Sequence, residues 1–491
     1  MTTMSNAPTA ITASGAVQGA YSASEDPSQR PVAVFKGIPY AEAARFRAPR
    51  PAQGWTGTRD ATQFSGVAPQ SPGVMDRLFS ARDLRFTEDC LALNVYTPAA
   101  DGQRRPVMVW IHGGGFTGGA GSIPWYDGSQ FGRQHDIVVV TINYRLGVLG
   151  FTHLEGIADG NAGLLDQVEA LRWVAANIEG FGGDPANVTI FGESAGAMSI
   201  GALLGMPAAA GHFRRAILQS GAADNVRTAA RAEEVTENVL NHLGLRAATA
   251  SRLYDLPLGQ ILEAQQTIGD DISGGGLPFG PVIDGTTFPQ APIEAVAAGA
   301  ARGVDVIVGV NAHEATLFNL LSNDDIDRTK LIGRATRVLG TRAETVVDTY
   351  LTNRPGRTAQ EVWIDLSSDL IFGVPARRLL VALAAAGGSA YDYLFRWETP
   401  AFGGRLRSCH ALEIPFVFDN LSAPGVTQFT GDAPERQVIA TAMHNAWAGF
   451  ARSGAPGSDW PKWSSEQRAT KVFDLEVTVQ DDPRGAELDL W

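Results

Sequence analysis

A single serine stands where one apolar run ends and another begins. Residues 187–200 read NVTIFGESAGAMSI, and Ser194 lies at the centre of the pattern G-x-S-x-G that runs from Gly192 to Gly196. The run before the serine predicts a strand and the run after it a helix, which is the context in which this pattern forms a nucleophile elbow. A strained turn would project the hydroxyl, and only glycine would fit on either side of it. The pattern therefore predicts nucleophilic catalysis by Ser194, and a glycine-rich turn with a capping serine is the alternative.

Three consecutive glycines follow the predicted strand 107–112. Residues 112–116 read HGGGF, and such a run frees backbone N–H groups to point outward. Acyl transfer needs donors aimed at the oxygen where negative charge develops. We therefore predict an oxyanion hole made of the backbone N–H groups of Gly114, Gly115 and Ala195. A flexible loop at the end of a strand is the alternative.

A catalytic serine needs a base, usually a histidine, and a carboxylate that orients this base. Around an elbow of this kind the chain order is serine, acid, histidine, so only histidines after Ser194 qualify. His410 lies in a loop before an apolar segment, where catalytic residues are often found, whereas His242 and His444 fall within helical patterns. The histidines that follow the serine are His212, His242, His313, His410 and His444.

Glu314 is the acid that the spacing favours. It follows the predicted strand 304–310 by a short turn, in GVNAHEATLF. A carboxylate just past the C-terminal end of a strand belongs on the active-site face of the sheet. An acid that the dipole favours at a helix N-terminus is the alternative. Spacing favours the pair Glu314 and His410 and leaves its rivals open, while His313 is expected to point away.

The elements that must position these residues form an α/β pattern, in which short β-branched runs alternate with longer helical stretches. Several runs are continuously apolar, as in strands buried on both faces of a mainly parallel sheet. We predict one domain over residues 1–491 with helices on both faces of the sheet and a partly helical cap at about 225–375. The predicted strands are 107–112, 136–144, 188–192, 215–221, 304–310 and 391–397, and the predicted helices are 164–178, 195–205 and 435–452.

Composition excludes several classes of function. The chain has 491 residues with 44% hydrophobic and 19% charged side chains, which is ordinary for a globular protein. A net charge of −13 argues against a nucleic-acid partner, because phosphate binding needs a basic face. Two cysteines without metal-ligand spacing predict neither a disulfide framework nor a metal site. Since we find no signal peptide and no apolar run of ~20 residues, we expect a cytoplasmic protein without a membrane partner.

Taken together, these motifs resemble the type-B carboxylesterases, the family of the cholinesterases and the bacterial para-nitrobenzyl esterases. The resemblance includes EDCLALNVYTP at 88–98, HGGGF, and GLLDQVEALRWVAANIEGFGGDPANVTIFGESAG at 163–196. The segment CHALEIPFVFDNL is most similar to the para-nitrobenzyl esterase branch. The resemblance implies a bacterial serine esterase with the α/β-hydrolase fold and a Ser194–Glu314–His410 triad that needs no cofactor.

The resemblance also assigns residues around the triad. It implies the three oxyanion donors already predicted, and it places Glu193 in the substrate pocket, where we expect it to tune the electrostatic potential without transferring protons. The family's ion pairs would join Arg45 to Glu88 and Arg145 to Asp166. Apolar candidates for the pocket, for which a place in the core is the alternative, are Phe116, Trp125, Leu317, Phe318 and Phe372.

The chain departs from the family pattern in two places that bear on structure. Many relatives pair the cysteine of EDC with an earlier cysteine, but Ala68 stands in the matching stretch here, so Cys90 is expected to be unpaired. The acid motif is usually DEG, and here it reads HEA at 313–315. The carboxylate is kept, while the turn after it is expected to differ, because alanine tolerates positive φ poorly.

The function predicted is hydrolysis of small to medium uncharged aryl or alkyl esters through an acyl-enzyme. A carbamate or amide hydrolase with the same triad is one alternative, and a non-catalytic binding protein of the same fold is another. The expected partner is a small-molecule ester, and a monomer or a weak dimer is the expected assembly.

Overall fold

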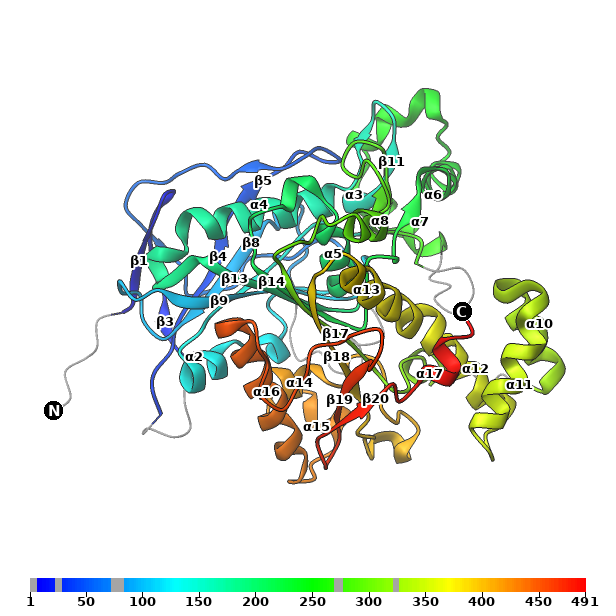
Figure 1. Ribbon diagram of the computed structural model, residues 1–491. Coiled ribbons are helices and arrows are strands. Elements are labelled where there is room, and N and C mark those ends of the chain that lie inside the picture. The colour runs from blue at the N-terminus through cyan, green and yellow to red at the C-terminus, as the bar shows by residue number, and fades with distance from the viewer. Residues whose placement is uncertain (1–6, 23–28, 72–83, 269–276, 321–325) are drawn as a thin grey trace.

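A large mixed sheet forms the middle of the computed structural model (Figure 1). Seven neighbouring strands, from β19 to β10, run parallel, and antiparallel strands extend both edges. The structure describes residues 7–22, 29–71, 84–268, 277–320 and 326–491. Among these residues the eleven strands of the sheet, in spatial order, are β20 (Thr478–Asp481), β19 (Ala469–Phe473), β18 (Ser389–Phe395), β17 (Asp305–Asn311), β14 (Arg215–Gln219), β13 (Gly183–Glu193), β9 (Arg105–Ile111), β10 (Val138–Ile142), β8 (Ala92–Thr97), β4 (Ala33–Pro39) and β3 (Ala20–Tyr21).

Side chains of the central strands alternate between two hydrophobic cores. In β9, Val107, Val109 and Ile111 face one core, whereas Met108 and Trp110 face the other. This period of two explains why the strands read as continuous apolar runs, since both faces of the sheet are covered. The helices packed in the first core are α4 (Ala162–Asn177), α5 (Ala195–Leu204) and α13 (Val374–Ala385), and those in the second are α2 (Ser129–His135), α14 (Ile414–Val417) and α16 (Arg436–Ser453).

The stretch expected to form a cap, 225–375, is mainly helical but is not continuous in space. Strand β17 belongs to the central sheet although it lies inside this stretch. Helices α10, α11 and α12 pack on each other in a third core around Leu331, Val347 and Trp363, at one side of the molecule (Figure 1). The helices here are α6 (Ala229–His242), α7 (Leu258–Ile268), α8 (Pro292–Ala297), α9 (Thr316–Asn319), α10 (Arg328–Leu339), α11 (Ala343–Asn353) and α12 (Ala359–Ser368).

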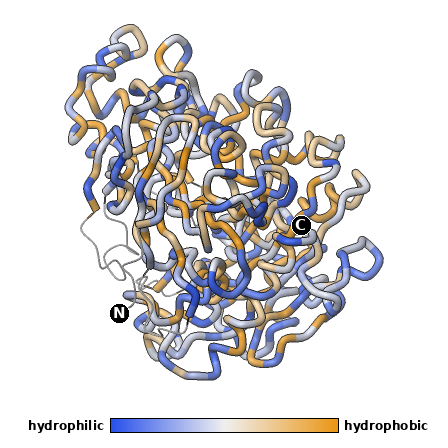
Figure 2. Tube along the Cα trace, turned by 90° about the vertical axis from the view of Figure 1, so that its left-hand side faces the viewer, coloured by the Kyte–Doolittle hydropathy of each residue, from blue (hydrophilic) through white to orange (hydrophobic). Residues whose placement is uncertain are grey.

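Short elements complete the fold outside the sheet and the long helices. Hydrophobic and hydrophilic segments alternate along the trace of the chain (Figure 2). In the described part of the chain, no helix has both the length and the apolar character needed to cross a membrane. Examples of these short elements are α3 (Gly147–Phe151), β16 (Val282–Ile283) and α17 (Gly485–Leu488).

The sequence-based expectations for pairs and elements are confirmed. Each of the six expected strands and three expected helices overlaps an element of the structure. Arg145 donates to the buried Asp166 at 2.6 Å, and Arg45 forms its ion pair with Glu88. Both cysteines are buried and free, so the disulfide of many relatives is absent.

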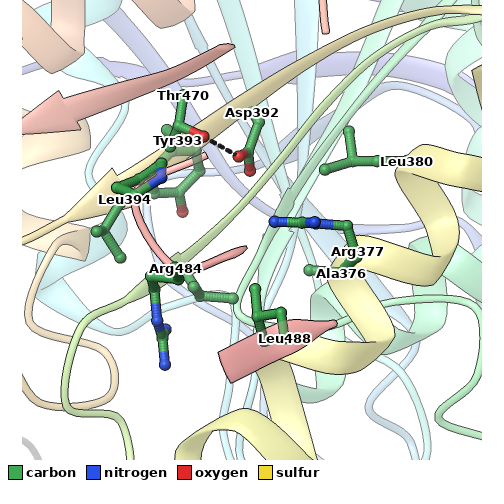
Figure 3. Close-up of a pocket in the computed structure, with 12 residues that line it drawn as sticks. Ala376, Arg377, Leu380, Asp392, Tyr393, Leu394, Thr470, Arg484 and Leu488 are labelled. Atoms are coloured by element: carbon green, nitrogen blue, oxygen red, sulfur yellow. Dashed lines mark hydrogen bonds between the residues drawn. The ribbon is translucent and has the colours of Figure 1, made fainter. Parts of the chain in front are cut away.

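A small cavity with a mixed polar and apolar lining lies between α13, β18 and the C-terminal segment (Figure 3). Its volume is about 30 Å³, which is room for about one water molecule. Thr470 donates to the carboxylate of Asp392 at 2.6 Å, and Arg377 and Arg484 line the same cavity. Burial raises the pKa of Asp392 to about 7, although Thr470 and Arg377 oppose the rise.

Candidate active site

Ser194 occupies a sharp corner between β13 and α5. Its backbone angles are φ 55° and ψ −124°, a conformation that costs a non-glycine residue energy and is concentrated at functional sites. Its N–H donates to the carbonyl of Gln219 on the neighbouring strand at 2.9 Å, which holds the corner against the sheet. Because α5 begins at the next residue, the positive end of its dipole lies at the serine.

Two glycines make this corner possible. A Cβ on Gly196 would lie 1.9 Å from the carbonyl oxygen of Ile111, and a Cβ on Gly192 would lie 2.5 Å from the same oxygen. Both distances are far below van der Waals contact with a backbone atom that cannot move away. The steric reason expected for the two glycines of G-x-S-x-G is therefore present in the structure.

The glycine loop after β9 passes directly beside the serine. A Cβ on Gly113 would lie 3.1 Å from Cβ of Ser194 and 2.7 Å from Oε2 of Glu193. Gly114 and Gly115 have φ of 113° and 62°, values that favour glycine. Among the described residues, none accepts a hydrogen bond from the N–H of Gly114, Gly115 or Ala195. These three N–H groups are therefore available to a ligand oxygen.

His410 and Glu314 form a buried pair next to this corner. Nδ1 of His410 lies 2.7 Å from Oε2 of Glu314, and the side chain of Glu314 is fully buried. The other carboxylate oxygen accepts from Oγ of Ser220 at 2.5 Å and from the N–H of Asn311 at 2.7 Å. A carboxylate with these donors is fixed in orientation, and it fixes the imidazole in turn.

Glu193 faces the second nitrogen of the same imidazole. Its Oε1 lies 3.0 Å from Nε2 of His410. Burial lowers the pKa of His410, but the charge of Glu193 and the hydrogen bond to Glu314 outweigh burial and raise it to about 9. Burial raises the pKa of Glu193 to about 8, which His410 opposes and the nearby carboxylates of Glu413 and Glu314 support. The site therefore holds a strongly coupled acid–base group that titrates above neutral pH.

A third buried carboxylate, Glu413, was not singled out from the sequence. Its two oxygens accept from the side-chain amides of Gln219 at 3.0 Å and Asn311 at 2.6 Å. Burial raises the pKa of Glu413, as does the charge of Glu314. The available signal was a lone acid in the apolar segment CHALEIPFVF, three residues after His410.

Gln70 was also missed, and it holds the glycine loop from the side. Its Oε1 accepts from the N–H of Gly119 at 2.7 Å, and its Nε2 donates to the carbonyl of Gly119 at 2.9 Å and to that of Ala68 at 3.0 Å. Gly119 lies against Gly113 and His112, since a Cβ on it would fall 2.4 Å from the carbonyl oxygen of Gly113. No sequence signal pointed to Gln70, because its partner lies in another segment.

The structure separates the apolar residues proposed for the pocket. Phe372 and Phe318 lie against the ring of His410, with ring centroids 4.7 and 5.1 Å away. Phe116 packs on Phe151 in the first core, with centroids 5.0 Å apart. Two other candidates belong to the second core: Trp125 stacks on Phe429, and Leu317 is partly buried at its margin.

The side chain of His313 points away from the triad, as expected. It lies between Arg357, whose Nη2 is 3.4 Å from Nε2, and Glu398, whose Oε1 is 3.8 Å from Nδ1. Burial and the charge of Arg357 lower the pKa of His313 to about 3, so this ring is neutral. The backbone N–H of His313 donates to the carbonyl of Ser408 at 2.9 Å. This hydrogen bond joins the turn that carries Glu314 to the loop that carries His410.

The chemistry available here is acyl transfer by an activated hydroxyl. A strained serine, a histidine–carboxylate pair and a glycine loop with free backbone N–H groups among the described residues lie at one corner, and each is a part that a covalent mechanism requires. Within the described residues, no group of three or more His, Cys, Asp or Glu side chains is arranged to hold a metal ion.

Comparison with known proteins gives a consistent result. A model of the carboxylesterase family matches residues 6–491. The chain is 38% identical to a para-nitrobenzyl esterase of Bacillus subtilis, with 91% of this chain and 92% of the relative covered. It is 36% identical to a fumonisin B1 esterase of Sphingopyxis macrogoltabida, over 92% of this chain and 84% of the relative. A solved carboxylesterase of Geobacillus stearothermophilus superposes with a TM-score of 0.88 at 41% identity, covering 98% of this chain and 99% of that one.

Proposed function

Because this chain belongs to the carboxylesterase family and is a serine ester hydrolase, we propose that Ser194, Glu314 and His410 form its catalytic triad. The observation that carries the proposal is the position of the strained Ser194 between the glycine loop and the His410–Glu314 pair. We include Glu193, Phe318 and Phe372 in the substrate site, since all three contact the imidazole.

The reaction proceeds in two steps. Nε2 of His410 takes the proton of the Ser194 hydroxyl as the oxygen attacks the ester carbonyl carbon, and the tetrahedral intermediate collapses by expelling the alcohol, which receives that proton from His410. Water then attacks the acyl-enzyme carbonyl while His410 takes its proton, and the second tetrahedral intermediate collapses by releasing Ser194, whose oxygen receives that proton from His410, together with the carboxylic acid. Glu314 holds the tautomer in which Nε2 can accept the proton, through its bond to Nδ1.

The backbone N–H groups of Gly114, Gly115 and Ala195 receive the oxyanion in both steps. Their donors are fixed by the positive-φ turn of the glycine loop and by the start of α5, so they need little reorganisation when charge develops. No hydrogen bond joins the two described residues Ser194 and His410 in the free enzyme. We infer that the contact closes when substrate enters, as it does in many hydrolases.

The substrates proposed are small to medium uncharged aryl or alkyl esters. The aromatic surroundings of His410 favour apolar acyl or alcohol groups. Relatives named as esterases favour an ester over a carbamate or amide as the bond that is cleaved, and they argue against a non-catalytic role.

We propose that residues 1–491 act as one catalytic domain with a partly helical cap at about 225–375. A bacterial, cytoplasmic enzyme is supported by the Bacillus relative and by two free thiols, which suit a reducing compartment. A monomer or weak dimer without membrane or nucleic-acid partners completes the proposal.

The test compares wild type with Ser194→Ala on para-nitrophenyl acetate, butyrate and octanoate. Loss of the serine should lower kcat on the order of 10³-fold or more, because triad members act as a unit. Ser199→Ala is the matched control, since Ser199 is buried in the helix that follows Ser194 and accepts a hydrogen bond from Gln167. Equal activity of Ser194→Ala and wild type would refute the assignment. The ranking of kcat/KM for the three esters would indicate how long an acyl chain the pocket accepts.

A further inference from the structure

A large pocket lies at the end of the sheet opposite Ser194. It is bounded by the start of β13, the last residues of α5, the loop 205–214 and the loop 300–304 that precedes β17. Ser194 lies at the other end of both β13 and α5, and the ten residues of that helix place it roughly 15 Å away. The volume of the pocket, about 640 Å³, is in the range of small-molecule sites.

The floor of the pocket is apolar. Val188, Leu203, Leu204 and Met206 line it but are at most 4% exposed. The apolar surface open to a ligand therefore comes from the exposed Pro207, Ala210 and Ala300, together with Phe213 and Val304. Phe213 and Val304 are partly buried along its walls and belong to the margin of the first core. Such a surface favours a hydrocarbon chain and gives a small hydrophilic ion, such as inorganic phosphate, nothing to replace its hydration.

The rim of the pocket is basic. Arg214 and Arg302 are exposed at it, and His212 lines it beside them. Within the described part of the chain neither arginine forms an ion pair, and none of the described residues that line the pocket is acidic. The chain has a net charge of −13, and many of its arginines are paired with carboxylates. Two unpaired guanidinium groups beside one apolar surface are therefore complementary in charge to an organic anion.

We propose that this pocket binds a medium-chain carboxylate, with its hydrocarbon chain on the apolar floor and its carboxylate between Arg214 and Arg302. Charge complementarity selects the anionic head, and the apolar floor selects the chain. The proposal rests on the proposed function only in that ester hydrolysis releases carboxylates of this kind. A product acid would thus have a second site on the enzyme, apart from the triad.

The test measures octanoate binding by titration calorimetry to the full chain carrying Ser194→Ala, which releases no product of its own. Adding Arg214→Ala and Arg302→Ala should weaken octanoate binding at this pocket by tenfold or more. Ala186→Trp fills the same pocket from an exposed position on the lining and should also abolish the binding. Arg246→Ala, an exposed arginine elsewhere, is the matched control and should leave the binding unchanged.

Three outcomes would overturn the proposal: no octanoate binding, binding that survives both the arginine pair and Ala186→Trp, or inorganic phosphate that binds as tightly as octanoate. The second outcome would show that octanoate binds outside this pocket, and the third would indicate a site for small anions. Ester turnover by the chain with Arg214→Ala and Arg302→Ala but an intact Ser194 should equal that of wild type. That assay keeps a failure of the second site distinct from a failure of the triad.

Discussion

Oε1 of Glu193 lies 3.0 Å from Nε2 of His410, the ring nitrogen opposite the one that contacts Glu314. The imidazole is thus held between two buried carboxylates. This arrangement stabilises the imidazolium that forms during proton transfer, but in the free enzyme it also keeps His410 protonated to higher pH.

The first prediction concerns this pair of residues. Glu193→Gln removes the main charge that raises the pKa of His410, so the pKa should fall from about 9 toward its ordinary value. The base form of His410 is the active form, and activity rises as pH passes this pKa. The rising limb of kcat/KM against pH should therefore move to lower pH in the variant, as measured with a para-nitrophenyl ester.

Glu398→Gln is the control for this shift, because Glu398 lies beside His313 and not beside His410. The control should keep the wild-type limb. A limb that stays in place in Glu193→Gln would mean that Glu193 does not set the protonation of the catalytic base.

The second prediction concerns the elbow. Gly196→Ala should lower the free energy of unfolding by about 3 kcal/mol or more, because its Cβ would lie 1.9 Å from a backbone oxygen in the sheet. Gly333→Ala is the contrasting case: a Cβ there meets nothing within 4 Å, in the middle of α10, and should raise helix stability slightly. Thermal unfolding of both variants checks the difference, and equal melting temperatures would contradict the steric account.

The serine corner and the glycine loop could be predicted from the sequence because their signals are local. Each consists of a strand pattern followed at once by small residues, so a short window contains both the element and its chemistry. The sheet was predictable for the same reason, since strands buried on two faces are continuously apolar. The cap was less so: β17 lies within the helical stretch, and only its pairing with β14 and β18 assigns it to the sheet.

The supporting shell of the triad could not be predicted, because its contacts join distant segments. Ser220 and the Glu314 that it bonds are 94 positions apart, and Gln70 and Gly119 are 49 apart. A serine after a strand and a glutamine in a loop are common, and nothing local distinguishes these two. Their roles follow from the fold, and only a three-dimensional arrangement brings them to the site.

The third prediction tests Gln70 as a positioning residue for the oxyanion loop. Gln70→Ala removes both hydrogen bonds to Gly119. The backbone N–H groups of Gly114 and Gly115 should then be less well oriented toward the oxyanion. We expect kcat to fall on the order of 10-fold with KM little changed, because the donors act in the transition state. Affinity for a trifluoromethyl ketone, which mimics the tetrahedral intermediate, should fall in parallel.

Gln134→Ala is the matched control for Gln70, since the exposed Gln134 donates its amide hydrogen bond to Asp419, outside the glycine loop. It should leave kcat and the inhibitor affinity unchanged. If Gln70→Ala left kcat unchanged, or raised only KM, the glycine loop would keep its geometry without the hydrogen bonds of Gln70.

The fourth prediction concerns stability and the small cavity of Figure 3. Burial raises the pKa of Asp392 from the ordinary 3.8 to about 7, so the folded protein binds this proton more tightly than the unfolded chain does. Between those two pH values stability falls as pH rises, and the full cost is present above pH 7. Asp392→Asn carries no charge and can still accept from Thr470. Its melting temperature should exceed that of wild type above neutral pH, and the advantage should shrink as pH falls toward 4.

Asp284→Asn should behave in the opposite way, which makes it the internal control for that pH series. Burial would raise the pKa of Asp284, but hydrogen bonds from the backbone N–H groups of Thr286, Thr287 and Phe288 hold it below its usual range. Its stabilising contribution is present at neutral pH and is lost as pH falls through the depressed value. The variant should therefore melt below wild type at neutral pH, with a difference that fades in acid. If Asp392→Asn showed that same pattern, its carboxylate would be stabilising when ionised, and the arginines of the cavity would outweigh its burial.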